Sequence, residues 1–194
     1  GLGLSEVAYQ NAAAYSKDRL QGKALNKNEE KEKVADPIIV HPDVRRMLLE
    51  MRSFNEGARA LALWTALNVD LSEDHPDQST RENSSDYLAL ITPIIKAFLT
   101  DSAFENTNLA LQCYGGHGYI RDNGIEQFVR DSRIAPIYEG TNGIQALDLV
   151  SRKMQIGDQR LIKGFFNLVN DHIKNQKNNN KLTLHTEKLK NSIE

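Results

Sequence analysis

Apolar side chains recur every three or four residues through most of the chain, which is the period of an α-helix. The longest such stretch begins after His41-Pro42 and continues for about six turns. Its apolar positions are Val44, Met47, Leu48, Met51, Phe54, Ala58, Leu61, Ala62 and Thr65. The pattern predicts that this is the longest helix of the protein.

A second apolar stripe lies near the start of the chain and stops near Gly22. It consists of Leu4, Val7, Ala8, Ala12 and Tyr15. A third helix is predicted from the apolar spacing of Leu88, Ile91, Ile95, Phe98, Ser102, Leu109 and Cys113. Pro93 lies inside it, and an interior proline removes a backbone hydrogen bond, although Thr92-Pro93 could also be a cap and a first helical position. We expect a kinked or restarted helix there.

Shorter helices are predicted over residues 125–133 and after Thr141, which suits an N-cap. The inner face of the latter would consist of Ile144, Leu147, Val150 and Met154. Two polar stretches are predicted to be connections. They are residues 23–36, which include Asn26, Asn28 and the run 29–33, and residues 71–85. Because no neighbouring runs alternate as strands do, the predicted fold is all-α, an up-and-down bundle of long antiparallel helices.

The composition changes after Gly157. One more amphipathic series is formed by Leu161, Phe165, Leu168, Val169 and His172, and residues 175–181 are nearly all Asn, Gln and Lys. We therefore expect a helical bundle domain over residues 1–156 and the start of an additional, truncated helical region over 157–194. Because the sequence opens on Gly1 in an apolar, helical pattern, we expect it to be part of a longer protein.

Charge and composition exclude several classes of protein. The 24 basic and 26 acidic residues are scattered and give a formal net charge of −2, which argues against a nucleic-acid partner. No apolar run approaches the roughly 20 residues that cross a bilayer, and no signal peptide pattern opens the chain, so we expect a soluble protein with no membrane partner. The single cysteine, Cys113, cannot form an internal disulfide, which fits a reducing cytoplasm or organelle matrix, and of these we expect a cytoplasmic location.

The most constrained part of the sequence is the window 112–145. Six of the twelve glycines lie there: Gly115, Gly116, Gly118, Gly124, Gly140 and Gly143. Glycine is costly unless the backbone needs positive φ or a close approach, so this window is the candidate active region. Within it Glu139 stands alone between Tyr138 and Gly140 on a loop before a helix. Such a carboxylate is well placed to act as a base, although a loop carboxylate taken alone would more often be solvated or capping.

Other residues of this window favour structural readings. His117 is expected to be a hydrogen-bonded loop residue rather than a catalytic one. Cys113 is expected to be buried packing, because no base is evident beside it. Arg130 and Asp131 could form a structural ion pair or could orient the loop before Glu139, and the sequence does not separate these two. We expect no metal site.

Three linked signatures in this window identify a family. They are Gln112-x-x-Gly115-Gly116-x-Gly118-Tyr119, Arg130-Asp131-x-x-Ile134 and Ile137-Tyr138-Glu139-Gly140-Thr141. In order and spacing they resemble the C-terminal helical domain of the flavin-dependent acyl-CoA dehydrogenases. The flanking sequences 1–25 and 36–46 most resemble the longer bacterial branch that includes 3-methylmercaptopropionyl-CoA dehydrogenase.

The resemblance implies specific roles. Glu139 would be the base that removes the α-proton of an acyl-CoA, and Gly140 would contact the substrate. Thr141 and Asn142 would lie on the flavin side of FAD. Gln112, Gly115 and Gly116 would meet the FAD of a neighbouring subunit, and Arg19 its pyrophosphate. The spacing Arg19-Leu20-Gln21-Gly22 is one residue shorter than is usual in the family.

The resemblance also implies partners. We expect an acyl-CoA substrate, electron-transfer flavoprotein or a similar acceptor, a homodimer or homotetramer, and FAD in the full-length enzyme but little FAD on this chain alone. Apolar side chains off the main stripe of the predicted longest helix, among them Leu49, Leu63 and Trp64, independently favour self-association. Two alternatives stay open, a catalytically inactive helical oligomerisation module and an acyl-CoA oxidase.

Overall fold

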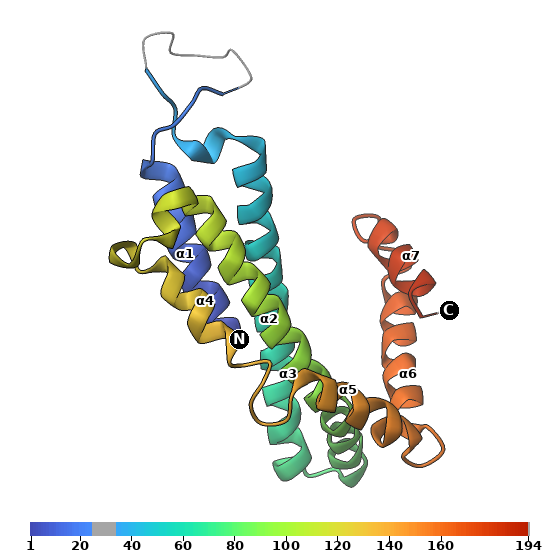
Figure 1. Cartoon of the computed structure of the whole chain (residues 1–194). Helices are drawn as coiled ribbons and strands as arrows, with labels where there is room; N and C mark the ends of the chain where they lie inside the picture. The colour runs from blue at the N-terminus through green and yellow to red at the C-terminus, as the bar shows by residue number, and fades with distance from the viewer. Residues whose placement is uncertain (25–33, 194) are drawn as a thin grey trace. The chain divides into compact units, whose positions relative to one another are not determined.

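The computed structural model describes residues 1–24 and 34–193, and the regular elements of this part are helices (Figure 1). The α-helices are α1 (Leu2–Asp18), α2 (Pro42–Asp74), α3 (Gln78–Tyr114), α4 (Ile125–Arg133), α5 (Asn142–Ser151), α6 (Arg160–Asn175) and α7 (Thr183–Asn191). Short 3-10 helices are η1 (Ile38–Val40), η2 (Gly115–Tyr119), η3 (Arg121–Asn123) and η4 (Lys153–Gln155). The predicted all-α class is confirmed. The connection predicted for Asn26, Asn28 and residues 29–33 lies outside the described residues.

The chain forms two compact units, each assembled from two stretches of sequence. The first unit comprises Gly1–Leu63 and Ile95–Gly143, and the second comprises Trp64–Ile94 and Ile144–Glu194. The six glycines of the window 112–145 and Glu139 belong to the first unit. The predicted boundary between domains 1–156 and 157–194 concerns the organisation of the sequence and stays a prediction.

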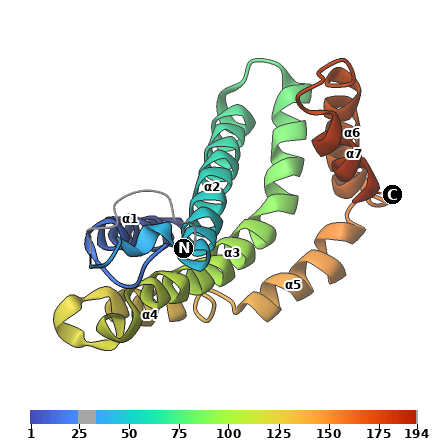
Figure 2. The same ribbon diagram turned by 90° about the horizontal axis from the view of Figure 1, so that it is seen from above.

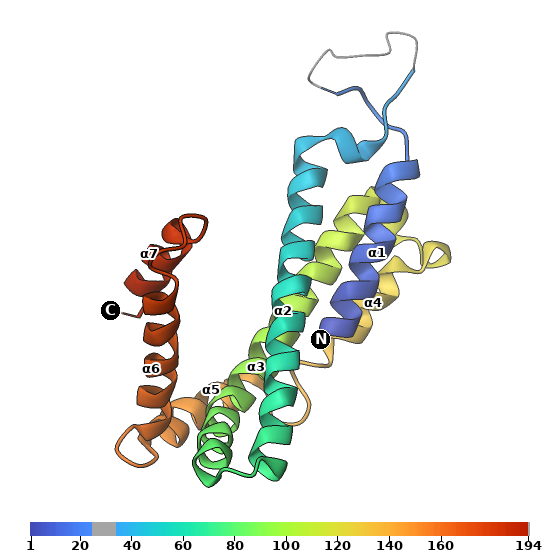
Figure 3. The ribbon, with the colours of Figure 1, turned by 180° about the vertical axis from the view of Figure 1, so that it is seen from behind.

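The core of the first unit draws on four helices. Its buried side chains are Ala8 and Ala12 of α1, Met47, Leu48 and Met51 of α2, Ala110 and Cys113 of α3, and Ile125 of α4. Met51 is fully buried, and burial of such a side chain contributes on the order of 1.5–3 kcal/mol. Figure 3 shows α1 lying alongside α4, and contacts between these helices join the two ends of the unit's sequence.

The buried face of α1 differs from the predicted stripe. The buried residues are Ser5, Ala8, Ala12 and Ser16, whereas Val7 is exposed. The buried spacing is still helical, but small residues occupy it, and they allow the helix axes to approach closely. A prediction based on large apolar residues therefore places Val7 on the buried face of the helix and leaves Ser5 out.

The loop predicted over residues 71–85 is wrong. Helix α2 continues to Asp74 and α3 begins at Gln78, so that only three residues connect them. The Asp77 carboxylate accepts hydrogen bonds from the hydroxyls of Ser79 and Thr80, both at 2.7 Å, and from the Thr80 amide at 2.9 Å. This is an N-cap, and it starts α3 inside a polar stretch. Polar residues are tolerated at exposed helix ends, so the polarity of residues 71–85 does not indicate a loop.

Helix α3 is assigned as one element with Pro93 inside it, so the helix is not restarted there (Figure 2). It has 37 residues against 33 in α2, which corrects the prediction that the helix after Pro42 is the longest. The statement that no apolar run approaches membrane length is also corrected. The segment Gln78–Tyr119 is long and apolar enough to cross a membrane by length and composition, a test that core helices of soluble proteins also pass.

The second unit contains the turn between α2 and α3, and α6 and α7. Trp64 and Tyr87 bring their rings within 5.7 Å. The guanidinium of Arg160 binds both carboxylate oxygens of Asp86 at 2.8 Å, which fixes the start of α6 on α3. Figure 3 shows α7 folding back beside α6, and these two helices are in contact.

Two shorter helices position the candidate site. Helix α4 spans the predicted residues 125–133. Helix α5 follows Thr141 as predicted, but its predicted inner face is wrong, because Ile144, Leu147 and Val150 are all more than half exposed. The helical period of these residues is real, yet the surface that they form is not buried within this chain.

Candidate functional site

The loop between α4 and α5 carries Glu139 at its centre. After α4 ends, the amides of Ile137 and Tyr138 both donate to the Ile134 carbonyl, at 2.9 and 3.2 Å. The loop is then closed on itself, since the Asn142 amide donates to the Pro136 carbonyl at 3.0 Å. We call residues 136–142 the base loop. Glu139 is the middle residue of this closed loop, and it is exposed.

The backbone of the base loop is left-handed at two successive residues. Glu139 has φ of +55° and Gly140 has φ of +79°. For glycine this conformation is free, but for a residue with a Cβ it costs on the order of 1–2 kcal/mol. Such strain persists where the surroundings impose it, and it is common at functional sites. The Glu139 side chain is exposed, so burial within this chain does not account for the conformation.

Asn142 anchors the base loop to α3. Its side-chain amide nitrogen donates to the Asp101 carboxylate at 2.7 Å and to the Thr100 hydroxyl at 3.0 Å. Its side-chain oxygen accepts a hydrogen bond from the Lys96 ammonium at 2.7 Å, and the same ammonium donates to the Gly140 carbonyl at 2.9 Å. The loop is thus held by polar contacts to one turn of a long helix.

Contacts between α4 and α3 set the start of the base loop. The hydroxyls of Thr107 and Ser132 are 2.9 Å apart, and both residues are fully buried. The guanidinium of Arg133 lies 5.6 Å from the centre of the Phe104 ring, a cation–π contact. A cavity of about 460 Å³ adjoins the loop and is lined by Asp101, Phe104, Arg133, Pro136, Ile137, Thr141, Asn142 and Gly143.

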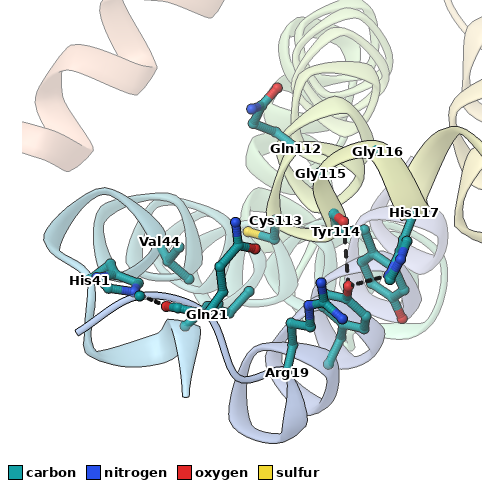
Figure 4. Close-up of a pocket in the computed structure, with 13 residues that line it drawn as sticks. Arg19, Gln21, His41, Val44, Gln112, Cys113, Tyr114, Gly115, Gly116 and His117 are labelled. Atoms are coloured by element: carbon teal, nitrogen blue, oxygen red, sulfur yellow. Dashed lines mark hydrogen bonds between the residues drawn. The ribbon is translucent and has the colours of Figure 1, made fainter. Parts of the chain in front are cut away.

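A second cavity, of about 570 Å³, lies at the junction of α1, η1 and the end of α3 (Figure 4). Four of its lining residues, Arg19, Gln112, Gly115 and Gly116, are the predicted FAD contacts at the adenine and pyrophosphate side. Figure 4 shows Arg19 and Gln112 at opposite sides of the view, with the Gln112 amide directed away from Arg19. Gln21 and Gly22 also line this cavity, and both are hydrogen-bonded through their backbones to Asp36.

The Gly-Gly segment turns the chain out of α3 and leaves space beside it. Gly115 has φ of +59°, and a Cβ placed on Gly115 or Gly116 would meet no atom within 4 Å. The open space therefore belongs to the cavity and not to packing. Gly118 has the opposite reason for being glycine, since a Cβ there would lie 2.6 Å from the Leu111 carbonyl oxygen.

An aromatic group forms one wall of this cavity. The rings of Tyr15 and Tyr114 stack with centroids 3.9 Å apart, and the Tyr15 hydroxyl lies 2.9 Å from Nδ1 of His117. His117 is therefore hydrogen-bonded, as expected, although it lies in the 3-10 helix η2 rather than in a loop. Cys113 is buried, and burial raises the pKa of its thiol to about 11, which suits a packing role rather than a nucleophile.

The structure thus sorts the predicted site residues into two groups. Arg19, Gln112, Gly115 and Gly116 share the cavity at the end of α3, whereas Thr141 and Asn142 line the other cavity, next to Glu139 and Gly140 in the base loop. Among residues 1–24 and 34–193, no three His, Cys, Asp or Glu side chains gather as metal ligands would.

Sequence reasoning missed the polar anchor on α3. The apolar spacing that predicts this helix singles out none of Lys96, Thr100 and Asp101. Lys96 is 46 positions from Asn142, its hydrogen-bond partner. No local spacing signals such a pairing. Only the predicted antiparallel course of neighbouring helices could have suggested that some polar group of this helix meets the base loop.

Comparison with known proteins settles the family. The family model described as "Acyl-CoA dehydrogenase, C-terminal domain" matches residues 1–154. The chain belongs to this family. Within the acyl-CoA dehydrogenases, it is 43% identical over 169 residues to 3-methylmercaptopropionyl-CoA dehydrogenase of Ruegeria pomeroyi, covering 87% of this chain and 28% of that protein. It is 40% identical over 152 residues to a butyryl-CoA dehydrogenase of Syntrophomonas wolfei, covering 75% of this chain and 23% of that protein.

The fold is also that of solved acyl-CoA dehydrogenase relatives. The structure of Caenorhabditis elegans ACDH-11 in complex with C11-CoA superposes with a TM-score of 0.76 at 24% identity, covering 93% of this chain and 28% of that one. At this identity the likeness concerns the fold alone. This acyl-CoA dehydrogenase domain therefore spans about a quarter of the length of the curated relatives that it matches.

Proposed function

We propose that this chain supplies the catalytic base of an FAD-dependent acyl-CoA dehydrogenase, and that Glu139 is that base. The observation that carries the proposal is the base loop, in which an exposed glutamate has φ of +55° in the middle of a closed turn. A carboxylate kept in an unfavourable backbone conformation by a buried and hydrogen-bonded support has the preorganisation that a base needs.

The chemistry is the formation of an α,β double bond in an acyl thioester. FAD would supply the hydride acceptor for the β-carbon. In this chain, the Glu139 carboxylate would take the α-proton, and the base loop would fix its distance and angle to that proton. Gly140 would let the substrate thioester approach the backbone, since it adds no side chain beside the base.

Acyl-CoA dehydrogenases depend on FAD, and the two cavities described above suit two different parts of that group. The cavity at the end of α3 offers the Arg19 cation and open backbone at Gly115 and Gly116, which fits a pyrophosphate. The cavity beside the base loop is lined by Thr141 and Asn142, which fits the flavin side. We propose that each cavity receives FAD from a different active site of an oligomer.

Substrate, acceptor and assembly follow from the family. We propose an acyl-CoA substrate and an electron-transfer flavoprotein or similar acceptor. We also propose a homodimer or homotetramer. The exposed apolar residues Leu49 and Leu63 of α2, each about two-thirds exposed, would contribute to such an interface. A strict monomer of the full-length enzyme in sedimentation at micromolar concentration would refute this assembly.

The test of the base is Glu139→Gln in the full-length enzyme. The amide keeps the shape of the side chain but cannot take a proton, so the rate of anaerobic flavin reduction by acyl-CoA should fall by about 10²–10⁴-fold. Bound FAD should stay at the level of the unsubstituted enzyme. The matched control is Glu105→Gln, which removes an exposed carboxylate from α3 and should leave the rate unchanged.

Two results would overturn the assignment. One is flavin reduction by the Glu139→Gln enzyme at the rate of the Glu105→Gln control. The other is loss of FAD in proportion to the loss of rate, because Glu139 would then hold the cofactor rather than the proton.

A further inference from the structure

The base loop lacks an apolar anchor at its tip. Ile137 and Tyr138 are both about half exposed, and Glu139 and Gly140 are exposed. Such a loop would be mobile unless polar contacts held it, because few buried apolar groups oppose its opening. Two consecutive left-handed residues make a specific support more necessary, since Glu139 prefers other backbone regions.

One side chain contacts the base loop at two points, at Gly140 and at Asn142. The Lys96 ammonium donates to the Gly140 carbonyl at 2.9 Å, directly after Glu139, and to the Asn142 side-chain oxygen at 2.7 Å. A donor that carries a charge makes stronger hydrogen bonds than a neutral donor. Lys96 is partly buried on α3, so the helix fixes the position from which it reaches the loop.

Asn142 carries this support to the point where the loop closes. Its amide nitrogen is held by Asp101 at 2.7 Å and Thr100 at 3.0 Å, and its backbone N–H donates to Pro136 at 3.0 Å. Lys96 therefore joins the carbonyl next to the base and the residue that closes the loop. Removing the ammonium would free both contacts at once, while Asp101 and Thr100 would still hold Asn142.

We propose that Lys96 is a positioning residue that holds the Glu139–Gly140 turn in its left-handed conformation and thereby sets the orientation of the Glu139 carboxylate. This rests on the proposed function of Glu139. Lys96 acts on the Gly140 carbonyl and on the Asn142 side chain, so its effect on the reaction passes through the backbone of the loop. The rate of proton abstraction should depend on Lys96 more than substrate affinity or FAD content does.

The test compares Lys96→Met with Lys174→Met in the full-length holoenzyme. Methionine keeps the length of the stem and removes the charge, and Lys174 is an exposed lysine of α6 that pairs with Asp171. We expect Lys96→Met to lower the rate of anaerobic flavin reduction per bound FAD by about 10–100-fold, since small misplacements of a catalytic group have effects of this size. The dissociation constant for acyl-CoA should change less than threefold. Lys174→Met should change neither.

A second readout does not depend on activity. In hydrogen exchange of the same enzymes, amides of residues 137–142 should exchange at least about tenfold faster in Lys96→Met, while those of α6 should not change. Lys96→Arg retains a cationic donor and should recover part of both the rate and the protection. That pattern would be absent if the lysine only contributed to folding.

The outcomes separate this proposal from the proposed function. If Glu139→Gln is inactive and Lys96→Met reduces flavin at the control rate, the positioning role is refuted and the base stands. If Glu139→Gln is active, the base itself is refuted. If Lys96→Met and Lys96→Arg both fail to fold or lose FAD in proportion to the rate, Lys96 is a folding residue and the positioning role is refuted.

Discussion

A buried polar cluster that joins α1, α2 and α3 gives a sharp test of how the first unit is held together. The Ser5 hydroxyl donates to the Asn55 side-chain oxygen at 2.6 Å and accepts from the Asn106 amide at 2.8 Å. All three residues are less than 5% exposed. Replacing Ser5 by alanine changes the shape little, but it leaves one buried acceptor and one buried donor without their partner.

The expected cost follows from these two groups. A buried polar group left unsatisfied costs roughly 1–3 kcal/mol, so the two groups left by Ser5→Ala should lower the free energy of unfolding by about 2–6 kcal/mol. The Asn55 side-chain nitrogen already has no hydrogen-bond partner, so the Asn55 side chain would keep no hydrogen bond to compensate for the loss of Ser5. Helix propensity alone favours alanine over serine at this position of α1, so a loss of stability would have to come from the buried polar groups.

Urea unfolding followed by circular dichroism measures this change. The matched control is Ser53→Ala, which removes an exposed hydroxyl of α2 that bonds only within its own helix and should shift stability by less than about 0.5 kcal/mol. The triple variant Ser5→Ala, Asn55→Leu, Asn106→Leu removes all the polar partners and should lose less stability than Ser5→Ala alone. A Ser5→Ala variant as stable as the control would refute the reasoning.

Gly118→Ala should destabilise the protein by about 1–3 kcal/mol, because the new Cβ would press on the Leu111 carbonyl. Gly57→Ala, in open space on α2, should instead stabilise the protein by about 0.5–1 kcal/mol. Thermal unfolding compares the two variants, and equal melting temperatures would contradict the packing argument. Hydrogen bonds from Ser79 and Thr80 hold the pKa of Asp77 well below its ordinary value. A carboxyl group whose pKa is lowered in the folded state adds stability above its unfolded pKa, near 3.9, and this stability is lost as the pH falls. Asp77→Asn should therefore weaken the loss of stability that the protein shows on acidification. An unchanged loss of stability at acid pH would refute the role of Asp77 as a cap.

The elements that sequence reasoning found are those whose signals are local. The helix predicted over residues 125–133 is confirmed by α4, which has the same bounds. The family signatures around Glu139 were found because their spacing lies within a short window. The loop over 71–85 was wrong because one carboxylate, Asp77, starts a helix among residues that read as polar connection.

The elements that were missed depend on contacts between distant residues. Ser5 is buried because asparagines of two other helices meet it, and nothing in the sequence near Ser5 indicates that. The exposed face of α5 could not be recognised, since Ile144 has the same period whether its partner lies within this chain or outside it. The Lys96 contact likewise joins residues more than forty positions apart.

The placement of the aromatic residues allows each unit to be followed by its own light signal. The single tryptophan, Trp64, belongs to the second unit and lies against Tyr87, whereas the stacked pair Tyr15 and Tyr114 belongs to the first unit and forms a wall of the larger cavity. Tryptophan emission therefore reports melting of the second unit. Near-ultraviolet dichroism of the stacked tyrosines reports the first, so a single chain without any attached dye distinguishes concerted unfolding of the two units from their unfolding one after the other.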